Sequence, residues 1–131
     1  MYSLATHPAA KLYQQISAHS EIEDASPHRL IQLLMEHALM KISRARGQLA
    51  EGNIAEKGAS IGDAISVING LQASLNHKED PRMSENFDAL YTYMMRRLLE
   101  ANLHNDADML DEVAGLLREL KEAWDAIADE V

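Results

Sequence analysis

Histidine and glutamate side chains are the groups in this sequence that could bind a metal ion. The histidines occupy six positions: His7, His19, His28, His37, His77 and His104. None of them belongs to a His-Glu-x-x-His pattern or has a second histidine nearby at helical spacing. Glu100 and His104 would share a helix face, but two such residues on one helix are an ordinary coincidence, and a histidine near a helix end also suits the helix dipole. We therefore expect no metal site.

The residues needed for most kinds of catalysis are also missing. The chain has no cysteine, so a thiol nucleophile is impossible, and it contains no glycine-rich phosphate loop. The pattern Gly-x-Ser-x-Gly occurs at positions 58–62, but no strand pattern precedes it, as a nucleophile elbow requires. A two-metal carboxylate site in a helical bundle would need two Glu-x-x-His pairs, which this sequence lacks. The sequence therefore predicts no catalytic residues, no cofactor and a protein that is not an enzyme.

Size and composition set the class of protein. A chain of 131 residues is long enough to bury the core of one domain without disulfides. The N-terminal residues lack the basic and apolar regions of a secretory signal. No stretch approaches the ~20 apolar residues that span a membrane. We expect a soluble cytoplasmic protein that does not insert into a membrane.

The chain is acidic, and much of the acid lies near its C-terminus. The net charge is −9. Nine acidic residues follow His104: Asp106, Asp108, Asp111, Glu112, Glu119, Glu122, Asp125, Asp129 and Glu130. Nucleic acids and anionic membranes are bound by clustered lysine and arginine. We therefore expect no nucleic-acid partner, and we interpret the acidic face as a solvated one.

Turn and capping residues divide the sequence into helices. Ser26 followed by Pro27 predicts a helix start, because the serine hydroxyl caps free amides and proline fits the first turn. Gly52 is typical of the residue that ends such a helix, near Glu51. Asn53 and Glu56 have the spacing of a capping box, which predicts a second helix that reaches about position 76.

Two further helices follow. Pro81 marks a turn before a third helix, with Asp80 or Ser84 as its cap. That helix should end near His104, where Asn105-Asp106 provides turn chemistry and a new cap. The fourth helix carries Trp124, which we expect to close the core, although a tryptophan can also anchor a partner.

These elements predict an all-α fold, an antiparallel up-and-down four-helix bundle with an N-terminal strap or short helix. Four helices of roughly 23 to 25 residues would each be about 35 Å long at ~1.5 Å per residue, and short connections favour antiparallel neighbours. We assign residues 26–131 to the bundle and residues 1–25 to the strap. Leu12, Tyr13 and Ile16 could form one apolar helical turn, too short to be stable unless it docks.

The third helix is apolar around an unusually large part of its circumference. Between Asn86 and Asn102 the apolar arc spans roughly 240°, against the ~100° stripe of an ordinary surface helix. Tyr93 flanks this arc on one side, and Met95 and Leu99 flank it on the other. Such a helix is either enclosed by its neighbours or binds both the core and another chain.

Several segments, in this order and spacing, resemble the family of flagellin export chaperones called FliS. The resemblance covers all four helices and extends to Tyr13, which matches a tyrosine of the family's N-terminal segment. The matching residues are Ala25 to Ile31 (ASPHRLI); Asn86-Phe87 with Leu90-Tyr91-x-Tyr93-Met94-x-Arg96-Arg97-Leu98-Leu99-x-Ala101-Asn102; Asp111-Glu112-Val113 with Leu116-Leu117; and Ala123-Trp124. The chain departs from the family at Glu36-His37, where Asp-Gly is common, and at Ala10, where an apolar residue is frequent.

The resemblance implies a four-helix bundle that binds the disordered C-terminal segment of new flagellin and prevents its premature polymerisation in the cytoplasm. It also implies delivery of flagellin to the type III export apparatus through the membrane export-gate protein. For the client groove we predict eight residues: Tyr13, Ile16, Leu30, Leu34, Tyr91, Tyr93, Met94 and Leu98. The alternative is a self-associating structural or adaptor bundle, in which the apolar face of the third helix is a dimer interface.

Overall fold

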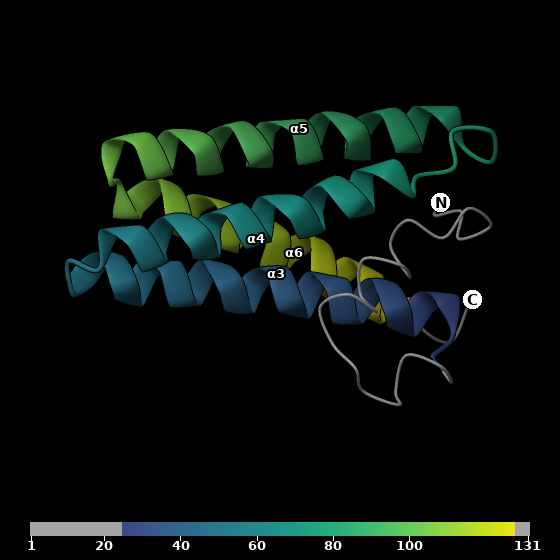
Figure 1. Cartoon of the computed structure of the whole chain (residues 1–131). Coiled ribbons are helices and arrows are strands. Elements are labelled where there is room, and N and C mark those ends of the chain that lie inside the picture. The colour runs from purple at the N-terminus through teal and green to yellow at the C-terminus, as the bar shows by residue number, and fades with distance from the viewer. Residues whose placement is uncertain (1–24, 128–131) are drawn as a thin grey trace.

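The computed structural model describes residues 25–127 and confirms the predicted all-α fold. Four helices follow one another: α3 (Pro27–Ala50), α4 (Ile54–Ala73), α5 (Pro81–His104) and α6 (Ala107–Ala126). They lie lengthwise beside one another, and the chain turns back at alternate ends of the bundle (Figure 1). Each helix packs on the next, and α6 closes the ring against α3.

Side chains placed just before the helices account for three of the four helix starts. The Ser26 hydroxyl accepts a hydrogen bond from the amide of Arg29 at 3.1 Å, and the Asp80 carboxylate accepts one from the amide of Met83 at 3.2 Å. The Asp106 carboxylate accepts bonds from the amides of the second and third residues of α6, at 2.9 and 3.3 Å. These bonds satisfy amides that have no partner within their own helix.

The second helix differs from the prediction at both ends. Asn53 precedes α4, but its side chain makes no hydrogen bond that caps the helix. The side-chain amide of Asn53 instead donates to the Glu51 carboxylate at 3.2 Å. The predicted capping box is therefore wrong. The helix also ends at Ala73, three residues earlier than expected, where the Ser74 hydroxyl donates back to the carbonyl of Gly70 at 2.9 Å.

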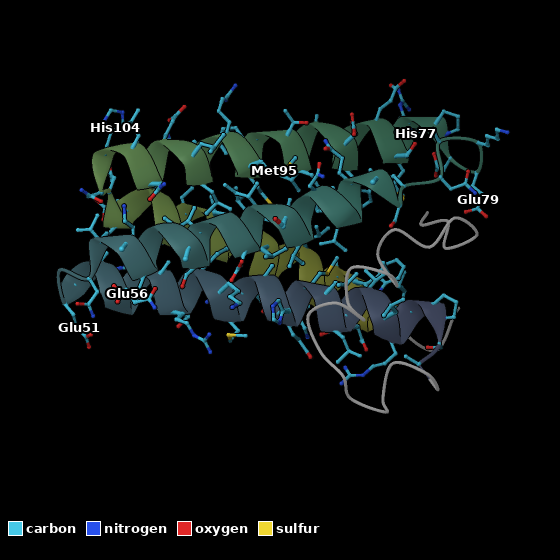
Figure 2. All side chains as sticks on the ribbon, viewed as in Figure 1. Glu51, Glu56, His77, Glu79, Met95 and His104 are labelled. Atoms are coloured by element: carbon cyan, nitrogen blue, oxygen red, sulfur yellow. The ribbon has the colours of Figure 1, made fainter. Side chains whose placement is uncertain are left out.

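The turns place the helix ends at two poles of the bundle. The turn from α3 to α4 contains Gly52 with φ 77°, and the turn from α5 to α6 contains Asn105 with φ 51°, both left-handed conformations that these residue types tolerate. Figure 2 shows Glu51 at one pole together with His104, whereas His77 lies at the opposite pole, in the turn from α4 to α5.

One apolar core runs through the bundle and receives side chains from every helix. The residues with the largest fully buried side chains are Ile31, Leu34, Met35, Ile42, Ile61, Ile68, Leu71, Tyr91, Met94, Leu98, Leu110 and Leu117. Trp124 is also buried and belongs to this core, as predicted. The helical spacing of these residues explains why each helix packs with one face inward.

A buried lysine joins α4 to the end of α5. Only 2% of Lys57 is exposed, and its ammonium donates to three oxygens: the carbonyl of Asn102 at 3.0 Å, the side-chain oxygen of Asn102 at 2.7 Å and that of Asn105 at 2.6 Å. A positive charge at the C-terminal end of a helix also interacts favourably with the helix dipole. Lys57 therefore fixes the last turn of α5 against α4.

The predicted strap lies outside the described residues, and Tyr13 and Ile16 lie there with it. The division of the chain at position 25 therefore remains a prediction. Between residues 25 and 127, no helix is both long and apolar enough to cross a membrane.

Candidate functional site

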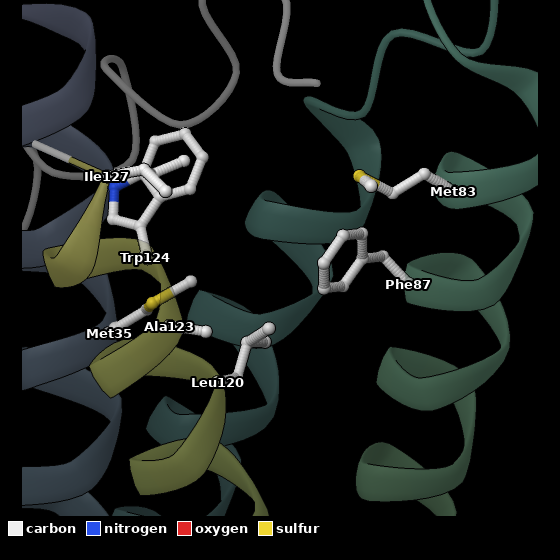
Figure 3. Close-up of a pocket in the computed structure, with 7 residues that line it drawn as sticks. All are labelled: Met35, Met83, Phe87, Leu120, Ala123, Trp124 and Ile127. Carbon is white, nitrogen blue, oxygen red and sulfur yellow. The ribbon is translucent and has the colours of Figure 1, made fainter. Parts of the chain in front are cut away.

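An apolar cavity opens between α3, α5 and α6 near the pole that carries the α4–α5 turn (Figure 3). Its volume is about 190 Å³. All seven lining side chains are apolar: Met35 from α3, Met83 and Phe87 from α5, Leu120, Ala123 and Trp124 from α6, and Ile127 just after α6. Such a surface suits apolar side chains of a ligand and offers no acid, base or nucleophile.

The helical period brings these residues together. Met83 and Phe87 are four residues apart and therefore lie on one face of the first turns of α5. Leu120 and Trp124 on α6, and Ile127 just after it, recur at the same kind of spacing. Because α5 and α6 run in opposite directions, the start of one lies beside the end of the other.

The cavity is open to solvent on one side, and on the opposite side hydrogen bonding and stacking hold its wall in place. Met83 is 42% exposed, and Phe87 is half-buried. Trp124, on the opposite wall, donates from its indole nitrogen to the carbonyl of His28 at 2.9 Å. Its ring also stacks on the imidazole of His28, with ring centres 4.4 Å apart and planes 10° from parallel. Contacts from α3 thus set the orientation of the Trp124 wall.

Most of the predicted groove residues lie in the core. In this structure the side chains of five of them are buried: Leu30, Leu34, Tyr91, Met94 and Leu98. They occupy the stripes by which α3 and α5 pack on the other helices, and they do not line the cavity. In this conformation they form no open groove, because a stripe that faces the other three helices is covered by them.

Tyr93 is the predicted groove residue that reaches the surface within residues 25–127. Its side chain is half-buried, and its hydroxyl donates to the Glu112 carboxylate at 2.7 Å, across the seam between α5 and α6. Arg97 donates to the other oxygen of Glu112, also at 2.7 Å. The guanidinium of Arg96 lies 5.4 Å from the centre of the Tyr93 ring, within the range of a cation–π contact.

These contacts shift the pKa values of the groups that make them. The hydrogen bonds from Arg97 and Tyr93 lower the pKa of Glu112. The bond to Glu112 in turn raises the pKa of the Tyr93 hydroxyl, because the phenol must keep its proton to donate it. The seam between α5 and α6 is therefore joined by a polar cluster of Tyr93, Arg97 and Glu112, some distance along α5 from the cavity.

The sequence patterns did not predict this cavity as a candidate site. Met83, Phe87 and Leu120 are not among the predicted groove residues. Trp124 was placed in the core with a binding anchor as the alternative, and it proves to be both buried and cavity-lining. The signal in the sequence is the i, i+4 pair of Met83 and Phe87, which begins before Asn86, the first residue of the range over which the wide apolar arc is described.

Part of the wide apolar arc of α5 remains on the surface. Leu99 is 59% exposed, and Leu103, just after the arc, is 77% exposed, whereas Met95 packs against the core. The other helices therefore do not enclose the whole arc.

The described part of the chain shows no arrangement suited to metal binding. Between residues 25 and 127, no three side chains of His, Cys, Asp or Glu gather closely enough to hold an ion. Glu100, considered above as a partner of His104, instead accepts a hydrogen bond from Arg97 at 2.9 Å.

Comparison with known proteins identifies the family. Residues 9–131 match the family model described as flagellar protein FliS. The chain is 48% identical to the flagellar secretion chaperone FliSB of Pseudomonas aeruginosa over 120 residues, which cover 92% of this chain and 95% of the relative. It is 43% identical to the flagellar secretion chaperone FliS of Salmonella typhimurium over 124 residues, 94% of this chain and 92% of that one.

A more distant relative extends the same pattern. Identity to the flagellar secretion chaperone FliS of Vibrio cholerae is 36% over 118 residues, 90% of this chain and 87% of that protein. The resemblance noted in the sequence is thus confirmed along most of the chain, and the family is one of chaperones, not of enzymes. The chain belongs to the FliS family of flagellar secretion chaperones.

Proposed function

We propose that this protein binds the C-terminal segment of newly made flagellin in the cytoplasm, prevents its premature polymerisation and delivers it to the membrane export-gate protein of the flagellar type III apparatus. Family membership supports the flagellar role. The observation that carries the binding role is the open apolar cavity between α5 and α6, which can accept side chains of another chain.

The chemistry of the client fits this surface. A flagellin segment that is disordered before assembly would become an amphipathic helix with an unpaired apolar face, and burying that face removes the surface that starts polymerisation. Burial yields about 25 cal/mol per Å², but ordering a flexible client costs about 2–5 kcal/mol or more. Tight binding therefore requires a contact much longer than the cavity alone.

We propose that this longer contact runs from the cavity along the α5–α6 seam past Tyr93. Phe87 and Met83 would provide its apolar floor, and Tyr93 would leave Glu112 to meet the client. The five buried residues of the predicted groove would contact the client only if α5 shifted outward from the core. They are Leu30, Leu34, Tyr91, Met94 and Leu98.

The test of client binding is co-purification of the full chain with flagellin and with flagellin that lacks its C-terminal segment. We expect capture of the intact client alone. Equal capture of both forms would contradict the assignment of the C-terminal segment, and capture of neither would contradict the chaperone role with flagellin.

The strap is proposed to cover part of the groove through Tyr13 and Ile16 and to move aside for the client. Deleting residues 1–17 and titrating the variant with a peptide of the flagellin C-terminus tests this. A gating strap predicts tighter or faster binding by the shortened chain, and a strap that contacts the client predicts weaker binding. Unchanged affinity and kinetics would contradict both roles.

A second candidate function rests on the exposed leucines of α5. Leu99 and Leu103 would be covered if two copies of the chain associated through this helix as a structural or adaptor dimer. Sedimentation of the client-free protein distinguishes the two functions. A tight dimer that Leu103→Glu converts to a monomer would favour self-association, and a monomer would exclude it.

A further inference from the structure

His28 is a buried side chain whose ring nitrogens have no hydrogen-bond partner in the part of the chain that the structure describes. It lies in the first turn of α3, and it is 8% exposed. Neither of its ring nitrogens finds a partner among the described residues. Native proteins pair nearly all their buried polar groups, because a group that loses its water without gaining a partner destabilises the fold. The position of His28 therefore requires an explanation.

The imidazole lies against one wall of the apolar cavity, although it is not itself one of the lining side chains. It stacks on Trp124 at 4.4 Å between ring centres, and Trp124 lines the cavity. The carbonyl of His28 also accepts the indole N–H at 2.9 Å. The two rings thus form a single unit near the cavity, at the pole of the bundle where α3 begins and α6 ends.

The charged and polar groups around this unit are already engaged with one another. Asp125, the residue after Trp124, accepts hydrogen bonds from Gln32 at 2.7 Å and from Lys121 at 2.6 Å. Lys121 also lies 3.6 Å from the carboxylate of Glu36, which pairs with Arg29 at 3.5 Å. This network holds α3 and α6 together, and none of its described members makes a hydrogen bond to the imidazole.

We propose that the ring nitrogens of His28 bind the main chain of the client segment that occupies the cavity. The inference rests on the proposed function, and it adds a polar contact to a surface that is otherwise apolar. A peptide that inserts an apolar side chain also removes its own N–H and C=O groups from water, and these groups then need partners. A neutral imidazole offers one donor and one acceptor. The client thus supplies what His28 lacks in the free protein.

This assignment predicts opposite effects on stability and on binding. His28→Phe keeps a flat ring against Trp124 and removes both nitrogens. The free protein should melt at a higher temperature, because a buried group without a partner has been replaced by an apolar one. Client affinity should fall by about five- to tenfold, the effect of one lost hydrogen bond. A histidine with a purely structural role would change the melting temperature alone.

The experiment is calorimetric titration of the full-length variants with a peptide of the flagellin C-terminus, together with their melting temperatures. His37→Phe is the matched control, since His37 is a half-buried histidine nine positions further along the same helix, and this variant should bind within about twofold of wild type. His28→Gln retains a donor and an acceptor and should keep most of the affinity. If His28→Phe does not fold, the affinity of His28→Gln is measured in its place.

Each remaining outcome has one meaning. If wild type binds the peptide and His28→Phe binds equally well, the role of His28 is overturned and the client function stands. If His28→Phe lowers the melting temperature while His28→Gln restores it, the imidazole is paired within the free protein and the inference is likewise overturned. If wild type does not bind the peptide, the proposed function itself is contradicted.

Discussion

At the scale of single residues, Lys57 has the most demanding position in the bundle. Its ammonium is buried, and it donates to three oxygens at the end of α5. No carboxylate compensates its charge among the partners found for it in the described residues; the oxygens of Asn102 and Asn105 and the dipole of α5 do so. A lysine in such a site is structural, because all three of its protons are used.

The first prediction concerns this lysine. Lys57→Met keeps most of the apolar stem but leaves the three oxygens without their donor, so the free energy of unfolding should fall by about 2 kcal/mol or more. Urea denaturation measures this change. Lys78→Met, in the exposed α4–α5 turn, is the control and should change stability by less than about 0.5 kcal/mol. Equal stability of the two variants would show that water replaces the ammonium.

The second prediction concerns acid stability and Glu112. The bonds from Arg97 and Tyr93 hold the folded-state pKa of Glu112 below its ordinary value of 4.5. A group with a depressed folded-state pKa stabilises the protein above its unfolded pKa, and this contribution is lost as the pH falls through the folded pKa. Glu112→Gln should therefore lose stability at neutral pH and depend less on pH below about 4.5.

Denaturation at a series of pH values between neutral and acid tests the role of Glu112. Glu122→Gln serves as the comparison, because Glu122 is an exposed glutamate of the same helix. Parallel pH curves for wild type and Glu112→Gln would show that the cluster with Tyr93 does not persist in solution.

The sequence predicted well which faces of the helices are apolar, but it predicted poorly which single residues are buried and which reach the surface. Tyr91 and Tyr93 look alike in sequence, yet one is fully buried and the other reaches a carboxylate on α6. The difference is a rotation of about 200° around the helix axis between residues two apart, and which side faces the neighbours depends on packing with helices distant in sequence.

At the scale of elements, side-chain caps mark the start of three of the four helices. Ser26, Asp80 and Asp106 make capping bonds, whereas Asn53 occupies the same position before α4 and makes none. The sequence pattern alone could not separate these cases, because a capping box depends on the backbone angles of the cap as well as on residue type. The side-chain amide of Asn53 donates a hydrogen bond to the Glu51 carboxylate instead.

The third prediction uses this contrast. Asp106→Ala should lower the free energy of unfolding by about 1 kcal/mol, because the amides of Asp108 and Met109 lose their acceptor. Asn53→Ala should cost about 0.5 kcal/mol or less, since its side chain caps nothing. Thermal unfolding of the pair measures both. A larger loss for Asn53→Ala than for Asp106→Ala would contradict the described cap geometry.

The pairing of elements was predictable, but the cavity between them was not. Similar helix lengths and short turns favour the antiparallel ring that the structure shows. The cavity depends on where the first turns of α5 meet the last turns of α6, and no local pattern records that alignment. Met83 and Trp124 are 41 positions apart in the sequence and still line one cavity.

At the scale of the whole molecule, packing is unequal around the ring. The α3–α4 interface is the most extensive of the four between neighbouring helices, and the α5–α6 interface is the least extensive. The cavity and the cluster of Tyr93 with Glu112 both lie on this α5–α6 side. The least extensive interface of the free protein is therefore also the one beside the surface proposed for the client.

The last prediction is that filling the cavity stabilises the free protein and weakens client binding. Ala123→Leu places apolar carbons in the cavity and should raise the free energy of unfolding by about 1–2 kcal/mol, at about 0.8 kcal/mol per buried methylene.

The leucine side chain of this variant occupies the space proposed for the client. Wild type should gain about 2.7 kcal/mol of stability at a peptide concentration of about 100 Kd, whereas Ala123→Leu should gain much less at that concentration. Ala55→Leu, exposed near the opposite pole, should gain as much as wild type. Chemical denaturation of the three proteins with and without peptide measures these gains, and an equal gain for Ala123→Leu would place the client outside the cavity.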